Sequence, residues 1–91
     1  MLVIKSVSAP VLAAGVMPAM TFGQFEKVSQ VLVSFDGPQI ADWVFEAVRT
    51  LATNVVTVTF RKQQTSAGGP TWGNAGNNDI TGRVTVLANG Y

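Results

Sequence analysis

The stretch DGPQIADWVFEAVRTLATN, residues 36–54, decides the fold class of this 91-residue chain, because every other regular segment of the sequence has the pattern of a strand. Asp36 and Gln39 have the spacing of a helix capping box. Pro38 suits the first helical turn, where its missing N–H leaves no hydrogen bond unmade. The apolar residues that follow recur every three to four positions, as on a helix buried along one face. They are Ile40, Trp43, Val44, Ala47, Val48 and Leu51. We therefore predict one helix near residues 38–52.

The segments around this predicted helix have strand patterns. Residues 1–8 are rich in Val and Ile, and apolar residues alternate with polar ones in residues 27–35, 56–61 and 80–86. These elements predict an α+β fold, a small two-layer sandwich in which an antiparallel or mixed sheet of about four strands packs against one helix. The last two strands are predicted to form a long β-hairpin. Its loop, residues 63–79, far exceeds the usual length of about two to five residues.

The composition describes a single domain, residues 1–91, with very little charge. Only 12% of the residues are charged, against about 25% in ordinary soluble domains. A small domain has a large surface for its volume and needs charge to keep that surface soluble. We therefore expect part of the surface to lie against other subunits. The net charge of +1 makes neither nucleic acid nor an anionic membrane an expected partner.

The chain contains neither Cys nor His, which excludes a disulfide, a Cys-bound zinc and every Ser/His or Cys/His catalytic pair. Asp42 and Glu46 would form a carboxylate pair on the predicted helix, and residues 74–79 offer oxygen ligands for a hard cation. Nothing near them in the sequence completes a site, so a solvated helix face and a turn are the simpler interpretations. We predict no enzymatic activity, no metal, no cofactor and no small-molecule substrate.

A few basic residues lie near an aromatic one, which is the pattern of a weak nucleic-acid contact. Arg61, Lys62 and Arg83 could bind phosphate while Trp72 stacks on a base. Three cations and one aromatic residue on a chain of net charge +1 favour ordinary solvated charges instead.

Residues 9–25 form an apolar arm. Twenty uncharged residues separate Lys5 from Glu26, a length that could cross a membrane. Pro10 and Pro18 interrupt this stretch, and the charge and small-residue pattern of a secretory signal is poor. We expect a packed segment of the domain here, with no membrane partner.

The arm and the long loop are the segments predicted to contact neighbours. A Trp flanked by Gly and Pro in a long loop is a common anchor at interfaces, although it can equally cover its own core. Met suits adaptable contacts as well as core gaps. The predicted protein interface consists of Trp72, Pro70, Met17, Met20 and Phe22.

These observations predict a non-enzymatic structural assembly protein, a homo-oligomer that binds copies of itself and other structural proteins. By analogy of architecture, virion components such as phage capsid decoration proteins or tail subunits have this character, which makes the virion the expected location. The alternative is a small protein-binding or inhibitory module that docks a partner through the Trp72 loop. An enzyme subunit with a site shared between chains is the third hypothesis. No motif indicates a family.

Overall fold

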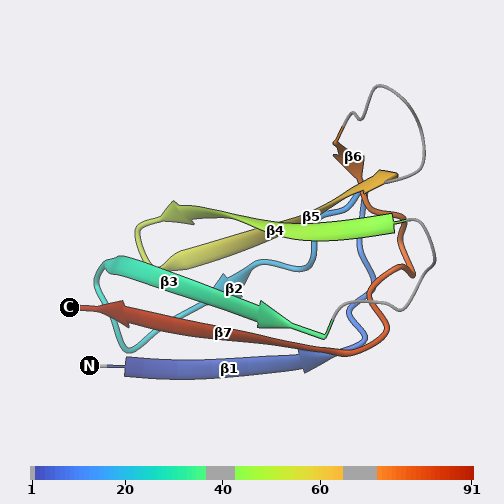
Figure 1. Cartoon of the computed structure of the whole chain (residues 1–91). Coiled ribbons are helices and arrows are strands. Elements are labelled where there is room, and N and C mark those ends of the chain that lie inside the picture. The colour runs from blue at the N-terminus through green and yellow to red at the C-terminus, as the bar shows by residue number, and fades with distance from the viewer. Residues whose placement is uncertain (1, 37–42, 65–71) are drawn as a thin grey trace.

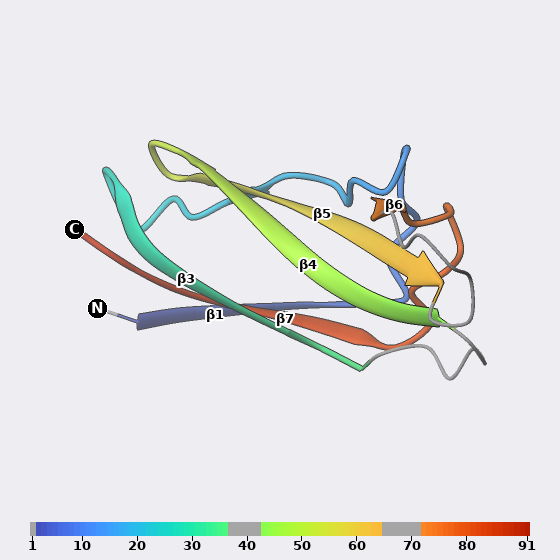
Figure 2. The same cartoon turned by 45° about the horizontal axis from the view of Figure 1, so that its top comes forward.

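Two antiparallel sheets form the part of the chain that the computed structural model describes, residues 2–36, 43–64 and 72–91. Sheet A has the strand order β1-β7-β3, and sheet B has the order β2-β5-β4, with β6 also paired to β5. The strand bounds are β1 (Leu2–Ser8), β2 (Met20–Thr21), β3 (Val28–Phe35), β4 (Trp43–Ala52), β5 (Val55–Gln64), β6 (Gly73–Asn74) and β7 (Arg83–Gly90). The sheets lie one above the other (Figure 1), and the strands of sheet B cross those of sheet A obliquely (Figure 2).

The predicted helix, and with it the α+β class, is wrong: the described residues are all β. Residues 43–52 form β4, which pairs with β5 from Trp43↔Gln64 to Ala52↔Val55. Residues 37–42, including most of the predicted helix start, lie outside the described residues. The segment is rich in aromatic and β-branched residues, which prefer a pleated surface. A ten-residue ladder with β5 satisfies the backbone groups on one side of the segment, so the spacing of its apolar residues did not decide its structure.

The predicted hairpin between the last two long strands is also wrong. The partner of β5 in the hairpin is β4, and the turn between them consists of Thr53 and Asn54. The Thr53 carbonyl accepts a hydrogen bond from the Val28 N–H, and the Asn54 carbonyl accepts one from the Phe22 N–H, both at 2.8 Å. Strand β7 lies in the other sheet, between β1 and β3. The sequence located these strands but not their pairing, because alternation does not specify a partner.

The strand predictions for residues 1–8, 27–35, 56–61 and 80–86 correspond to β1, β3, β5 and β7. As expected, Val31, Val33 and Phe35 face inward on β3, while the residues between them are exposed. The core forms where the inward faces of β5 and β7 meet between the sheets. Its buried strand residues include Val56, Val58, Phe60, Val84, Val86 and Ala88. The ring of Phe35 meets that of Phe60 edge-on, with their centroids 5.0 Å apart.

The apolar arm, residues 9–25, closes this core from the side of sheet B. Its buried residues are Pro10, Leu12, Gly15, Met17, Met20, Phe22 and Phe25. The Met17 N–H donates to the Val58 carbonyl at 3.0 Å, and the Phe60 N–H donates to the Gly15 carbonyl at 2.8 Å. The arm thus extends sheet B with irregular backbone. None of the described residues belongs to a helix long and apolar enough to span a membrane.

Candidate functional site

The outer face of sheet A exposes apolar side chains that the core does not use. The register places Ile4 of β1 beside Leu87 of β7, and Leu87 beside Leu32 of β3. Ile4 is 58% exposed and Leu32 is 65% exposed, with a half-buried Leu87 between them. Side chains directly opposite each other on one sheet face are close enough to touch. These three residues form a continuous apolar row across the sheet, the Ile4 row.

The rows on either side of the Ile4 row are neutral. One row consists of Ser6, Thr85 and Ser34, and the other of Leu2, Asn89 and Gln30. The hydroxyls of Ser6 and Thr85 lie 3.2 Å apart, within hydrogen-bonding distance. The three rows contain no charged side chain, and the next outward residue of β7 is the exposed Arg83, opposite Ser8. The central part of this face therefore offers dispersion contacts and hydrogen bonds, with a cation at its end.

A shallow groove of about 430 Å³ adjoins this face. Its lining residues are Leu2, Ser29, Gln30, Val31, Leu32, Arg49, Leu51, Leu87 and Asn89. Arg49 and Leu51 come from the end of β4, which runs close to β3. The groove has leucines in its lining, amides beside them and one cation, Arg49. This combination suits a largely apolar protein surface, and it contains no acid–base pair.

A second cluster of side chains holds residues 72–80 against sheet B. The Lys62 ammonium lies 2.9 Å from a carboxylate oxygen of Asp79 and 4.9 Å from the centroid of the Trp43 ring. The same Asp79 oxygen accepts a hydrogen bond from the Gly76 N–H at 2.6 Å. These hydrogen bonds, first that from Lys62 and then that from Gly76, hold the pKa of Asp79 below its usual value. We call this cluster the Lys62 clamp.

The predicted interface residues lie in three different environments. Met17, Met20 and Phe22 are buried in the core of this chain. Trp72 is half-buried, and its carbonyl accepts a hydrogen bond from Arg61 at 3.0 Å. Pro70 lies outside the described residues. That any of these residues contacts a partner stays a prediction.

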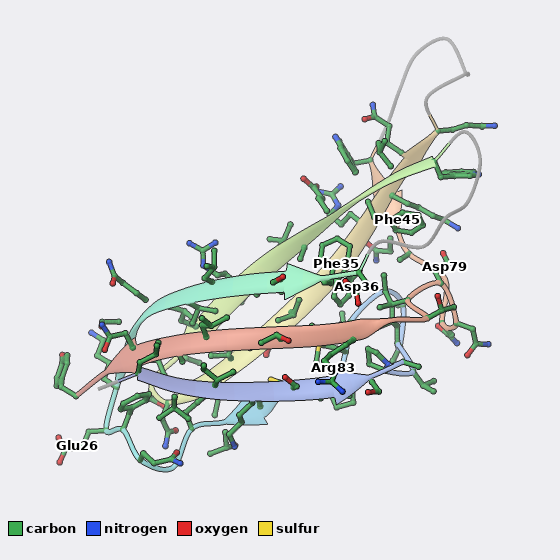
Figure 3. All side chains as sticks on the ribbon, turned by 60° about the horizontal axis from the view of Figure 1, so that its bottom comes forward. Glu26, Phe35, Asp36, Phe45, Asp79 and Arg83 are labelled. Atoms are coloured by element: carbon green, nitrogen blue, oxygen red, sulfur yellow. The ribbon has the colours of Figure 1, made fainter. Side chains whose placement is uncertain are left out.

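The acidic residues are spread along the molecule. Glu46 lies on β4, so the helical spacing that would pair it with Asp42 does not apply, and Asp42 lies outside the described residues. Figure 3 shows Glu26 at one end of the sandwich, with Asp36 and Asp79 toward the other. Among the described residues, no group of three or more His, Cys, Asp or Glu side chains is arranged to hold a metal ion.

Sequence reasoning did not single out the residues of the Ile4 row. The pattern did place Leu32 on the face opposite Val31 and Val33, but Ile4 and Leu2 appeared only as part of an apolar strand. The available signal was that these strands have apolar residues on both faces. A strand with only one face in its own core leaves such residues exposed.

Comparisons with protein-family models, with curated proteins and with solved structures find no match to this chain.

Proposed function

We propose that the protein is a non-enzymatic structural subunit that assembles with copies of itself through the outer face of sheet A. The observation that carries this proposal is the exposed Ile4 row, bounded by neutral rows and by the groove. Large exposed apolar patches on small domains commonly mark interaction surfaces, because covering them removes apolar area from water. The low charge of the whole chain supports the same proposal.

The chemistry of this face also favours one class of partner. The centre of this face has apolar, hydroxyl and amide side chains, with Arg83 and Arg49 only at its margins, so it offers little to a nucleic acid or an anionic membrane, which bind through clustered cations. It suits another protein surface of the same character. A subunit of a larger protein shell or tube, such as a virion decoration or tail protein, is the assembly that we propose for it, and other structural proteins are its further partners.

The protein-binding module remains the second candidate because of the position of Trp72. The hydrogen bond from Arg61 fixes the Trp72 backbone at the clamped end of sheet B, and part of the residue stays exposed. A partner bound there would lose affinity in Trp72→Ala, whereas assembly through sheet A would be unchanged.

Sedimentation velocity tests the proposed assembly. Wild-type protein is expected to form oligomers, and Leu32→Glu is expected to form smaller species, because the contact through the outer face of sheet A would bury an unpaired charge. Val11→Glu is the matched control: Val11 is 67% exposed, close to the 65% of Leu32, but lies outside sheet A. A wild type that remains monomeric up to about 1 mM, where a contact of about 4 kcal/mol becomes visible, would overturn the proposal.

A further inference from the structure

Strand β1 is an edge strand that lacks the usual protection. In the described part of the chain it pairs with β7 alone, in an uninterrupted register from Leu2↔Asn89 to Ser8↔Arg83. The other edge of such a strand presents backbone N–H and C=O groups that can pair with a further strand. Proteins commonly block this edge with proline, bulges, lysine or very short strands. Strand β1 has seven residues, no proline and no bulge.

The one charged residue of β1 does not protect the edge. The Lys5 ammonium donates a hydrogen bond to the Thr21 carbonyl at 2.7 Å and lies 5.1 Å from the centroid of the Phe22 ring. Its contacts therefore lie toward the arm and β2 of its own chain. The residues on either side of it, Ile4 and Ser6, lie on the outer face of the sheet.

The other edges of the two sheets are less open to a new strand. Strands β3 and β4 lie close to each other, and residues of both line the groove. Strand β2 has only two residues. Among the described strands, β1 therefore offers a seven-residue edge that pairs with no other strand of the chain. Figure 1 shows β1 at the lower border of the molecule, with β7 between it and β3.

We propose that two copies join edge to edge through antiparallel β1 strands, on a two-fold axis that passes beside Ile4. The two A sheets then form one continuous six-stranded sheet. This inference rests on the proposed self-assembly. It keeps a second copy of the chain as the partner and adds a contact along the β1 edge to the contact through the outer face of sheet A. An isologous contact of this kind is the commonest way in which identical subunits pair.

Symmetry and charge select the register. A two-fold axis normal to the sheet leaves each side chain on the same face of the sheet in both copies. Directly opposed residues of antiparallel strands also share a face, so the axis must pass beside a single residue, which then lies opposite the same residue of the second copy. An axis at Lys5 would pair the whole of β1, but it would place the two Lys5 residues, which carry like charge, directly opposite each other, which is unfavourable. An axis at Ile4 places Lys5 opposite Val3 of the second copy and Leu2 opposite its Ser6.

The Ile4 register also continues the apolar row. The row then runs Leu32, Leu87 and Ile4 in one copy and Ile4, Leu87 and Leu32 in the other. An axis at Ser6 would give the same overlap but would join the hydroxyl rows and leave Leu2 without a partner strand. Six strands about 4.8 Å apart present an apolar and neutral face twice as wide as that of one subunit. This wider face is available for the further contacts of a larger assembly.

Single-cysteine variants test the axis directly, because the natural chain has no Cys. Directly opposed antiparallel residues have Cα atoms about 4.5–5.5 Å apart, within the range that a disulfide requires. Ile4→Cys should therefore give a covalent dimer under mild oxidation. Leu2→Cys and Ser6→Cys are matched controls on the same face of the same strand. In this register each of those cysteines lies about 13 Å from its own copy, too far to form a disulfide.

The expected result is at least tenfold faster dimer formation by Ile4→Cys than by either control, with reduced samples of all three variants folded by circular dichroism. If the wild type forms oligomers but Ile4→Cys reacts no faster than the controls, edge pairing at Ile4 is overturned and the proposed assembly stands. Preferential reaction of Ser6→Cys would likewise overturn the Ile4 axis. A monomeric wild type with three unreactive variants would overturn both proposals.

Discussion

The structure reverses the burial that the sequence suggests for two segments, residues 9–25 and residues 43–52. The uncharged arm looks like a segment that reaches toward a neighbour, yet its apolar side chains lie in the core, including Met17 and a fully buried Phe22. The segment with the helical apolar stripe looks like the cover of a sheet, yet it is a strand that exposes Val44, Val48 and Leu51.

The difference between these segments shows that apolar content does not identify what is buried. The arm has no regular alternation, but its backbone is bonded to β5 through residues such as Met17 and Gly15. Strand β4 is regular, but it is the last strand of sheet B and has only one face on the core. Burial depends on position in the sheet order, which the local pattern does not contain.

Among the side-chain truncations, the largest effect is expected at Phe22 of the arm. Phe22→Ala removes a ring that is 0% exposed and should lower the free energy of unfolding by about 3–5 kcal/mol. Denaturant unfolding measures the loss. Val11→Ala, in the same arm but exposed, should change stability by less than about 0.5 kcal/mol. Equal effects of the two substitutions would show that the arm is not part of the core.

A glycine in the arm tests how closely its backbone approaches sheet B. Gly15 has a φ of 86°, and a Cβ there would lie 2.8 Å from the Phe60 carbonyl oxygen. Gly15→Ala should therefore destabilise the protein by about 2 kcal/mol, measured as a lower unfolding midpoint. At Gly23 a Cβ would have no neighbour within 4 Å, so Gly23→Ala should be neutral or slightly stabilising. A neutral Gly15→Ala would argue against this close approach.

The Lys62 clamp supports the arm from its other side, because the Leu12 N–H donates to the Asn77 carbonyl between Gly76 and Asp79. Asp79→Asn should cost about 1 kcal/mol at neutral pH, since the ion pair is partly exposed and screened by solvent. The folded-state pKa of Asp79 is lowered, so its stabilisation is present above the ordinary carboxyl pKa of 3.8. It is lost as the pH falls below that value through the folded-state pKa.

Unfolding midpoints measured from about pH 7 to about pH 3 check this dependence. The difference between wild type and Asp79→Asn should shrink toward the acidic end of this range. A difference that is constant with pH would mean that the carboxylate charge does not hold the clamp.

The smallest effect is expected on the exposed side of β4. Val48 is 41% exposed, so Val48→Lys should change stability by less than about 0.5 kcal/mol. On a helix packed against the sheet the same change would bury a charge and unfold the domain. Val58→Lys, at a buried position in the same hairpin, should do so. Thermal melts measure the unfolding temperatures of the two variants. If Val48→Lys is unfolded, Val48 is not on an exposed face of β4, and the contrast between this strand and the buried arm is wrong.

Part of the fold could be predicted from the sequence. The alternation in residues 27–35 placed β3 and gave its inward face correctly, the same pattern located β5 and β7, and Val and Ile content located β1. It failed at β4, where spacings of three and four residues satisfy a helical period while aromatic and β-branched residues favour a strand. Such a segment becomes a strand because β5, the next strand of the hairpin, offers a ten-residue ladder, and the pattern of residues 43–52 does not specify that pairing.

The candidate site was less accessible to sequence reasoning. Ile4 and Leu32 are separated by 28 positions and are brought into one row only because both strands pair with β7. By itself the sequence determined the low charge, the lack of Cys and His, and the position of four strands, because composition and alternation are local properties. Only the tertiary structure decided which apolar residues are buried and which remain exposed, because strand order and pairing partners arise from contacts between distant parts of the chain.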